Sequence, residues 1–98
     1  MFRHVFIIPV KEGITEEFLQ TKMQEMRDMK LTIPEIEDIH VGKTLGWIGN
    51  TESVMMTIDV KDKEAFGRLV SSDAHQNVAG KAEEAFVPAG AIVAQIEL

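Results

Sequence analysis

The chain contains no cysteine, no tyrosine and a single tryptophan. Without cysteine, disulfides and thiolate metal sites are excluded. Long apolar runs are also absent, since residues 5–10 and 89–94 fall far short of the roughly 20 residues that a membrane span needs. The N-terminus lacks the pattern of a signal peptide. We therefore expect no membrane partner and a cytoplasmic location.

Positive charge is scarce and scattered along the chain. Ten Lys and Arg residues stand against 16 Asp and Glu residues, which gives a net charge of −6 and a pI near 4.9. Surfaces that bind nucleic acids are normally basic, so this balance argues against a nucleic-acid partner. No glycine-rich phosphate loop, dinucleotide motif or nucleophilic serine motif is present, so we expect no cofactor. A length of 98 residues with 45% hydrophobic content predicts one globular domain over residues 1–98.

Hydrophobic periodicity and capping signals predict the secondary structure. Thr15 and Asp62 are placed to cap two helices, and Pro34 ends the first of them. Asp73, with Gln76 three residues later, is placed to start a further helical segment through a capping box. The predicted strands are residues 2–10, 36–44, 53–60 and 91–98, and the predicted helices are residues 16–31, 63–70 and 74–87.

The order strand, helix, strand, strand, helix, strand predicts a ferredoxin-like α+β fold (βαββαβ) with a four-stranded antiparallel sheet and its helices on one face. The first strand is apolar on both faces, because Phe6 and Ile8 alternate with Val5 and Ile7. The helices can cover only one face, so a monomer would expose a hydrophobic patch that includes Val5, Ile7, Met55 and Val93. We expect two copies to pair through this sheet face into a homodimer, a dimeric α+β barrel.

His75 lies in the first turn of the last predicted helix, on the same helix face as Val78, Ala79, Ala82 and Phe86. Burial and the positive end of the helix both favour a neutral imidazole, which is a useful proton acceptor near pH 7. His75 is therefore a candidate general base. The alternative is a core histidine whose nitrogens are bonded to backbone groups.

His4 shares the helix-facing side of the first strand, so His4 and His75 are expected to point into the same layer. Two inward histidines need polar partners, which favours a small ligand-binding cavity over a solid core. The alternative is a packed core filled by methionine. With His40, the histidines match no metal-ligand spacing, so we expect no metal site. The side chains expected to line the cavity and bind a substrate are Phe6, Ile8, Met23, Met26, Leu69 and Val78.

Trp47 is a further candidate for substrate binding, in a predicted loop between Gly46 and Gly49. It would serve either as a flap or partner contact, or as a tryptophan folded back over the core. We favour the second arrangement.

Several short segments occur in an order and spacing typical of one family: Arg3-His4-Val5-Phe6, Lys11-Glu12-Gly13-Ile14-Thr15, Ile33-Pro34-Glu35-Ile36 and Val41-Gly42-Lys43. The start of the last predicted helix, Asp73-Ala74-His75, is similar to that family's Pro-x-His element. On these segments, which extend over essentially the whole chain, the protein resembles the stress-responsive A/B barrel domain (Dabb) proteins of the dimeric α+β barrel superfamily.

The resemblance implies a ferredoxin-like protomer that pairs through its sheet. A plant polyketide cyclase of this family uses a histidine at the position of His75 as general base, and a histidine at the position of His4 lies in its pocket. The cyclase tyrosine that polarises the substrate carbonyl corresponds to Leu69, so this chain departs from the cyclase pattern. A related branch of the superfamily contains cofactor-free monooxygenases and small-lactone isomerases.

Two kinds of function are compatible with this sequence. In the first, a homodimer binds an apolar or aromatic carbonyl compound, His75 acts as base, and His4 orients the substrate or shares the proton, as in a cyclase or isomerase. In the second, the dimer has a structural or stress-related role without catalysis. A monooxygenase-like activity is a further alternative, and the sequence leaves open whether the protein is an enzyme.

Overall fold

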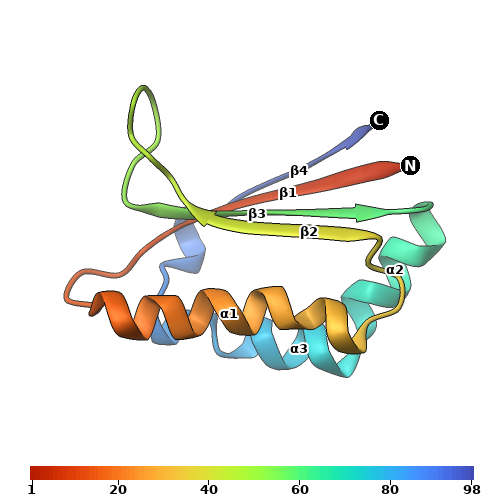
Figure 1. The fold of residues 1–98 in the computed structure, drawn as a ribbon, viewed down its shortest axis with the longest axis horizontal. Helices are drawn as coiled ribbons and strands as arrows, with labels where there is room; N and C mark the ends of the chain where they lie inside the picture. The colour runs from red at the N-terminus through yellow and green to blue at the C-terminus, as the bar shows by residue number, and fades with distance from the viewer.

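A computed structural model describes residues 1–98, and it contains one antiparallel sheet whose strand order is β2-β3-β1-β4. All helices lie on one face of this sheet, as Figure 1 shows. The predicted ferredoxin-like α+β fold is therefore confirmed. The strands are β1 (Phe2–Pro9), β2 (Asp38–Lys43), β3 (Ser53–Val60) and β4 (Ile92–Glu97), and the helices are α1 (Glu16–Thr32), α2 (Lys63–Ser71) and α3 (Asp73–Gly80).

The first two helices begin at the predicted caps. Thr15 Oγ1 accepts a hydrogen bond from the Phe18 backbone N–H at 3.1 Å, and Asp62 Oδ1 accepts one from Ala65 N–H at 2.8 Å. Helix α1 then buries Leu19, Met23, Met26 and Met29 against the sheet, as its spacing predicts. None of the helices is both long and apolar enough to cross a membrane.

Helix α3 differs from the prediction at both ends. Ser72 is its cap, because Ser72 Oγ accepts from the His75 N–H at 3.2 Å, and Asp73 is already helical. The predicted capping box is therefore wrong, and the Gln76 amide donates instead to the Val70 carbonyl at 2.9 Å. The helix ends at Gly80 rather than near residue 87, since glycine disfavours helix and the Lys81 N–H turns back to the Val78 carbonyl.

After α3 the chain forms a 3-10 turn (Ala82–Glu84) and returns to the sheet, where Phe86 forms an isolated bridge with Val10. The predicted strands 2–10, 36–44 and 91–98 are slightly shorter in the structure. Between sheet and helices lies the core, to which β3 contributes Val54, Met56, Ile58 and Val60, all nearly inaccessible to solvent.

The strand register fixes which side chains share a face. Phe6 pairs with Met56 on one side and with Val93 on the other, so Val93 lies on the helix-covered face. The expectation that Val93 belongs to the opposite face is therefore wrong. Ile7 instead pairs with Met55 and Ile92, which places all three on the face that no helix covers.

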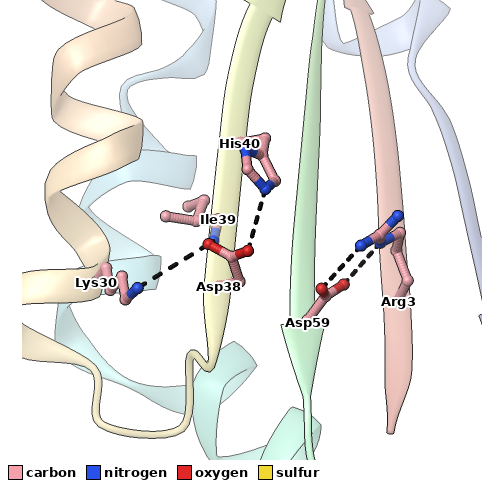
Figure 2. A network of polar contacts seen from close by, with 6 residues as sticks. All are labelled: Arg3, Lys30, Asp38, Ile39, His40 and Asp59. Carbon is pink, nitrogen blue, oxygen red and sulfur yellow. Dashed lines mark hydrogen bonds and ion pairs between the residues drawn. The ribbon is translucent and has the colours of Figure 1, made fainter. Parts of the chain in front are cut away.

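We call this uncovered surface of the sheet the bare face. It carries apolar side chains on three strands, and the charges of Arg3, Asp38 and Asp59 lie together at one end. There the Arg3 guanidinium of β1 donates to both oxygens of Asp59 on β3, at 2.7 and 2.9 Å (Figure 2). These bonds hold the pKa of Asp59 below its usual range. The apolar side chains of the bare face are Val5, Ile7, Met55, Ile92, Ala94 and Ile96.

Candidate functional site

A cavity of about 570 Å³ lies between the helix-covered face of the sheet and the helices. Strands β1 and β4 supply its floor, while α1, α2, α3 and the following 3-10 turn supply its walls. Most of its lining is apolar, including Met26, Met29, Met56, Phe66 and Phe86, and its polar side chains are few. Such a combination of an apolar lining with few polar groups is typical of small-molecule sites.

The structure brings most of the predicted site residues into this cavity. His4, Phe6, Ile8, Met26, His75 and Val78 all line it. Met23 and Leu69 do not, because each is packed inside the core with almost no exposed surface. Trp47 is also absent from the lining and is not folded over the core, since it is 88% exposed in the loop between β2 and β3. That expectation for Trp47 is wrong.

His75 is held by its Nδ1 atom. This atom lies 3.0 Å from the carbonyl oxygen of Val70, at the end of α2. A carbonyl oxygen can only accept, so Nδ1 carries the hydrogen and donates it. In the neutral ring the Nε2 atom is then a hydrogen-bond and proton acceptor. The break between α2 and α3, capped by Ser72, places the ring in this position.

His4 has the opposite hydrogen-bonding role at its Nδ1 atom. Gln95 of β4 lies directly across from His4 in the strand register, and its amide nitrogen is 3.0 Å from His4 Nδ1. An amide nitrogen can only donate, so Nδ1 of His4 accepts, and the neutral ring carries its hydrogen on Nε2. Phe66 of α2 packs against the His4 ring, with centroids 5.0 Å apart.

The cavity lowers the pKa of His4 below its ordinary value, first through burial and second through the positive charge that His75 can carry. His4 therefore stays neutral at pH 7. Its Nε2–H is available as a hydrogen-bond donor in an apolar surrounding.

Both histidines line the cavity. Neither Nε2 atom takes part in a hydrogen bond within the protein, and since no buried side-chain nitrogen or oxygen lacks a partner, both Nε2 atoms are accessible rather than buried. The two rings thus present a donor on His4 and an acceptor on His75 to the same apolar space. This is the arrangement that a general base and a carbonyl-orienting group require.

The family model of the stress responsive A/B barrel domain matches residues 2–93. The chain belongs to this family. The match includes His4, His75 and every residue that lines the cavity except Gln95. No curated protein matched the sequence.

Solved structures of low sequence identity share the fold. The Arabidopsis thaliana protein At3g17210 is 18% identical, with a TM-score of 0.86 over 100% of this chain and 95% of that one. A hydroxynitrile lyase from Passiflora edulis is 13% identical, with a TM-score of 0.86 over 99% and 92%. A dimeric ferredoxin-like protein of unknown function from Thermobifida fusca is 15% identical, with a TM-score of 0.83 over 99% and 90%.

A charged cluster lies at another part of the cavity of this A/B barrel protein. Lys22 of α1 is 6% exposed, and its ammonium group bonds to Glu84 of the 3-10 turn and lies 3.4 Å from Glu25. The bond to Glu84 raises the pKa of Lys22 and lowers that of Glu84. The cluster fastens the segment after α3 to α1 and so holds one cavity wall in place.

The third histidine lies outside the cavity. His40 is on the bare face, where its Nε2 is 3.1 Å from Asp38 Oδ2. The structure contains no group of three His, Asp or Glu side chains placed to hold a metal ion.

Sequence reasoning missed Gln95 and Phe66 as contributors to the histidine site. Gln95 is two residues after Val93 and so shares its strand face, which we expected from the sequence to point away from the helices. The signal that identifies Gln95 is the strand register, because a residue directly opposite His4 must share its face.

Proposed function

We propose that this protein binds an apolar or aromatic carbonyl compound in the cavity and transfers a proton at the carbon next to the carbonyl group. His75 Nε2 takes the proton, and the electron pair of the broken C–H bond moves into an enolate. His4 Nε2–H donates a hydrogen bond to the carbonyl oxygen, where negative charge develops. Return of the proton from His75 to a carbon of the enolate completes an isomerisation. In a ring closure, the enolate carbon instead attacks a second carbonyl carbon of the compound, the C=O π electrons move to that oxygen, and His75 returns the proton to the resulting alkoxide.

The opposite hydrogen-bonding roles of the two rings carry this proposal. Val70 makes His75 an acceptor at Nε2, and Gln95 makes His4 a donor at Nε2. Two identical roles would serve a carbonyl substrate less well, because its oxygen needs a donor and its acidic C–H needs an acceptor. No tyrosine exists in the chain, so His4 is the group best placed to polarise the carbonyl.

The chemistry of the lining supports the substrate class. Thirteen of the 20 lining residues are hydrophobic, and the volume of about 570 Å³ suits an aromatic or medium-sized apolar molecule. One neighbour of the same fold is a hydroxynitrile lyase, so the fold is compatible with enzymatic activity.

The proposal includes a homodimer that forms through the bare face. Ile92 is 57% exposed there and continues a surface of Val5, Ile7 and Met55. Exposed apolar sheet surface of this kind is costly in water, and two-fold pairing removes it. A structural neighbour is itself described as dimeric.

The test measures proton transfer without knowledge of the natural substrate. An aromatic β-keto compound is dissolved in deuterated buffer, and loss of its α-proton signal is followed by NMR with and without protein. We expect the protein to accelerate exchange and His75→Ala to lower that acceleration by about 10²–10⁴-fold, the usual contribution of one general base.

The matched control is His40→Ala, which removes an imidazole from the other side of the sheet and should leave the exchange rate unchanged. Equal rates for His75→Ala and the unaltered protein would contradict the role of His75. Binding of the compound without acceleration, seen as a thermal shift, would favour a binding protein over a catalyst.

A further inference from the structure

The loop between β2 and β3 carries the two most exposed large hydrophobic side chains of the protein, Ile48 and Trp47. Leu45, Trp47 and Ile48 are 70%, 88% and 94% exposed. Residues 44–51 include no charged side chain. Three large apolar side chains in one uncharged loop indicate a contact surface rather than a solvated connection.

The loop is a folded element. Its base is closed by hydrogen bonds between Thr44 and Ser53, including Thr44 N–H to the Ser53 carbonyl at 2.9 Å. Gly46 has a φ of +71°, and a side chain there would come within 3.0 Å of Thr51, so glycine is required at this bend. Trp47 and Ile48 are thus presented outward by defined backbone geometry.

In Figure 1 this loop rises from the sheet on the side away from the helices, which is the side of the bare face. A cleft of about 660 Å³ separates it from the neighbouring strand surface. Trp47 and Ile48 form one wall of this cleft, and Gly42 and Met55 of the bare face contribute to the other. An occupant of the cleft would therefore also lie against the bare face.

The bare face has a charged end and an apolar end. Arg3, Asp59, Asp38 and His40 occupy the end where β1 begins, as Figure 2 shows. The loop lies at the other end, where β2 finishes and β4 starts with Ile92.

This polarity selects between two ways of pairing the sheets. A two-fold axis across the strands would set the charged end of one copy on the apolar end of the other, which would bury the Arg3–Asp59 ion pair against apolar surface. An axis along the strands brings like ends together and reverses the strand order across the interface. It therefore sets β1 over the partner's β3 and β4 over the partner's β2, so that Arg3 faces the partner's Asp59.

We propose that the loop of residues 44–52 is an arm that grips a second copy of this chain, with the partner's β4, around the partner's Ile92, seated in the cleft between the loop and β2. This inference rests on the homodimer of the proposed function and adds its geometry. Trp47 and Ile48 cover apolar surface that would stay exposed at the edge of the dimer interface if the two sheets alone were in contact. The partner surface around Ile92 is apolar, which suits contact with a loop that has no charged side chain.

Trp47 provides a direct readout, because the protein contains no other tryptophan and no tyrosine. Its emission and its quenching by acrylamide are measured during dilution, while light scattering gives the mass of the same samples. We expect blue-shifted, protected emission in the dimer and red-shifted, quenchable emission once it dissociates. Trp47→Ala should raise the dimer dissociation constant at least about tenfold, whereas Leu31→Ala, which removes an exposed side chain of α1, should not change it.

A crosslink tests the geometry. The chain has no cysteine, and β2 and β4 are opposite edges of the sheet, about 14 Å apart. Ile48→Cys, in the loop that follows β2, and Ile92→Cys, on β4, are therefore too far apart to bond within one chain. We expect oxidation of this double variant to give a covalent dimer. Ile48→Cys with Lys61→Cys, at the charged end, should not crosslink between these positions.

The outcomes separate the two proposals. A dimer in which Trp47 stays fully quenchable, or in which only the Lys61→Cys pair crosslinks, overturns the arm and leaves the dimer intact. A mass of one chain at all concentrations overturns both the arm and the dimer, while the proton-transfer role of His75 is tested separately by exchange.

Discussion

At the scale of single residues, the proposed function depends on which nitrogen of each imidazole carries a hydrogen. His4 and His75 are chemically identical, and only their Nδ1 partners make them different. An amide donor opposite His4 and a carbonyl acceptor next to His75 leave complementary atoms facing the cavity. In the proposed reaction the pair therefore acts as donor and acceptor without any charged catalytic group.

Burial lowers the pKa of His4, with His75 as a smaller cause. Because the ring of His4 stays neutral, it does not repel the proton that His75 receives in the proposed reaction. A charged His4 would oppose protonation of His75, since like charges in an apolar cavity destabilise each other. The proposed activity should therefore be lost as acid protonates His4.

At the scale of elements, the position of His75 depends on the break between α2 and α3. Ser72 caps α3 by accepting from the His75 N–H itself. We expect Ser72→Ala to lower the free energy of unfolding by about 1 kcal/mol, the usual cost of losing a cap. Urea unfolding followed by circular dichroism measures this change.

Asp73→Ala is the matched control for the cap, because Asp73 follows Ser72 and accepts no capping bond. Its effect should be smaller, limited to the interaction of its charge with the helix end. Equal losses for the two variants would contradict the assignment of Ser72 as the cap.

The caps illustrate what the sequence could and could not predict about the elements. Thr15 and Asp62 were identified correctly because each is followed by a clear apolar period. Before α3, the run Ser71-Ser72-Asp73 offers several capping residues, and local preference does not choose among them. The structure selects Ser72, because its hydroxyl bonds both the Leu69 carbonyl and the His75 N–H and so joins the two helices.

The sequence predicted only part of the candidate site, because local spacing decides some positions and long-range strand pairing decides others. Strand and helix periods placed His4 and His75 in one layer, since each depends only on local spacing. Gln95 could not be placed, because the face of β4 follows from its pairing with β1 across most of the chain. Met23 and Leu69 lie on the buried sides of their helices, but both are packed in the core, while neighbours such as Lys22 and Val70 line the cavity.

At the scale of the whole molecule, the sheet is apolar on both faces, and only one is covered. We expect Val5→Glu to split the homodimer, because it places an unpaired charge in a dry interface. Light scattering at micromolar concentration should give the mass of one chain for this variant and of two chains for the unaltered protein.

Leu31→Glu is the control for this substitution. It adds the same charge at an exposed position on α1, away from the sheet, and should leave the dimer intact. A Val5→Glu protein that keeps its fold and still has the mass of two chains would contradict pairing through the bare face.

The apolar character of both faces was visible in β1, so the need for a partner could be predicted from the sequence. The composition of the bare face could not, because Val93 and Ile92 exchange places when the register of β4 is known. The exposed position of Trp47 could not be predicted from local sequence either. An apolar side chain in a loop can fold inward or contact another chain, and local propensity does not decide between the two.

The central claim is that the two cavity histidines hold opposite neutral tautomers. Long-range proton–nitrogen NMR correlation of the ¹⁵N-labelled protein near pH 7 reads the tautomer of each imidazole, with His4→Gln and His75→Gln used to assign the signals. Our account predicts the hydrogen on Nε2 in His4 and on Nδ1 in His75, with His4 titrating below its ordinary pKa. The same tautomer in both rings, or rapid averaging between tautomers in either, would contradict it.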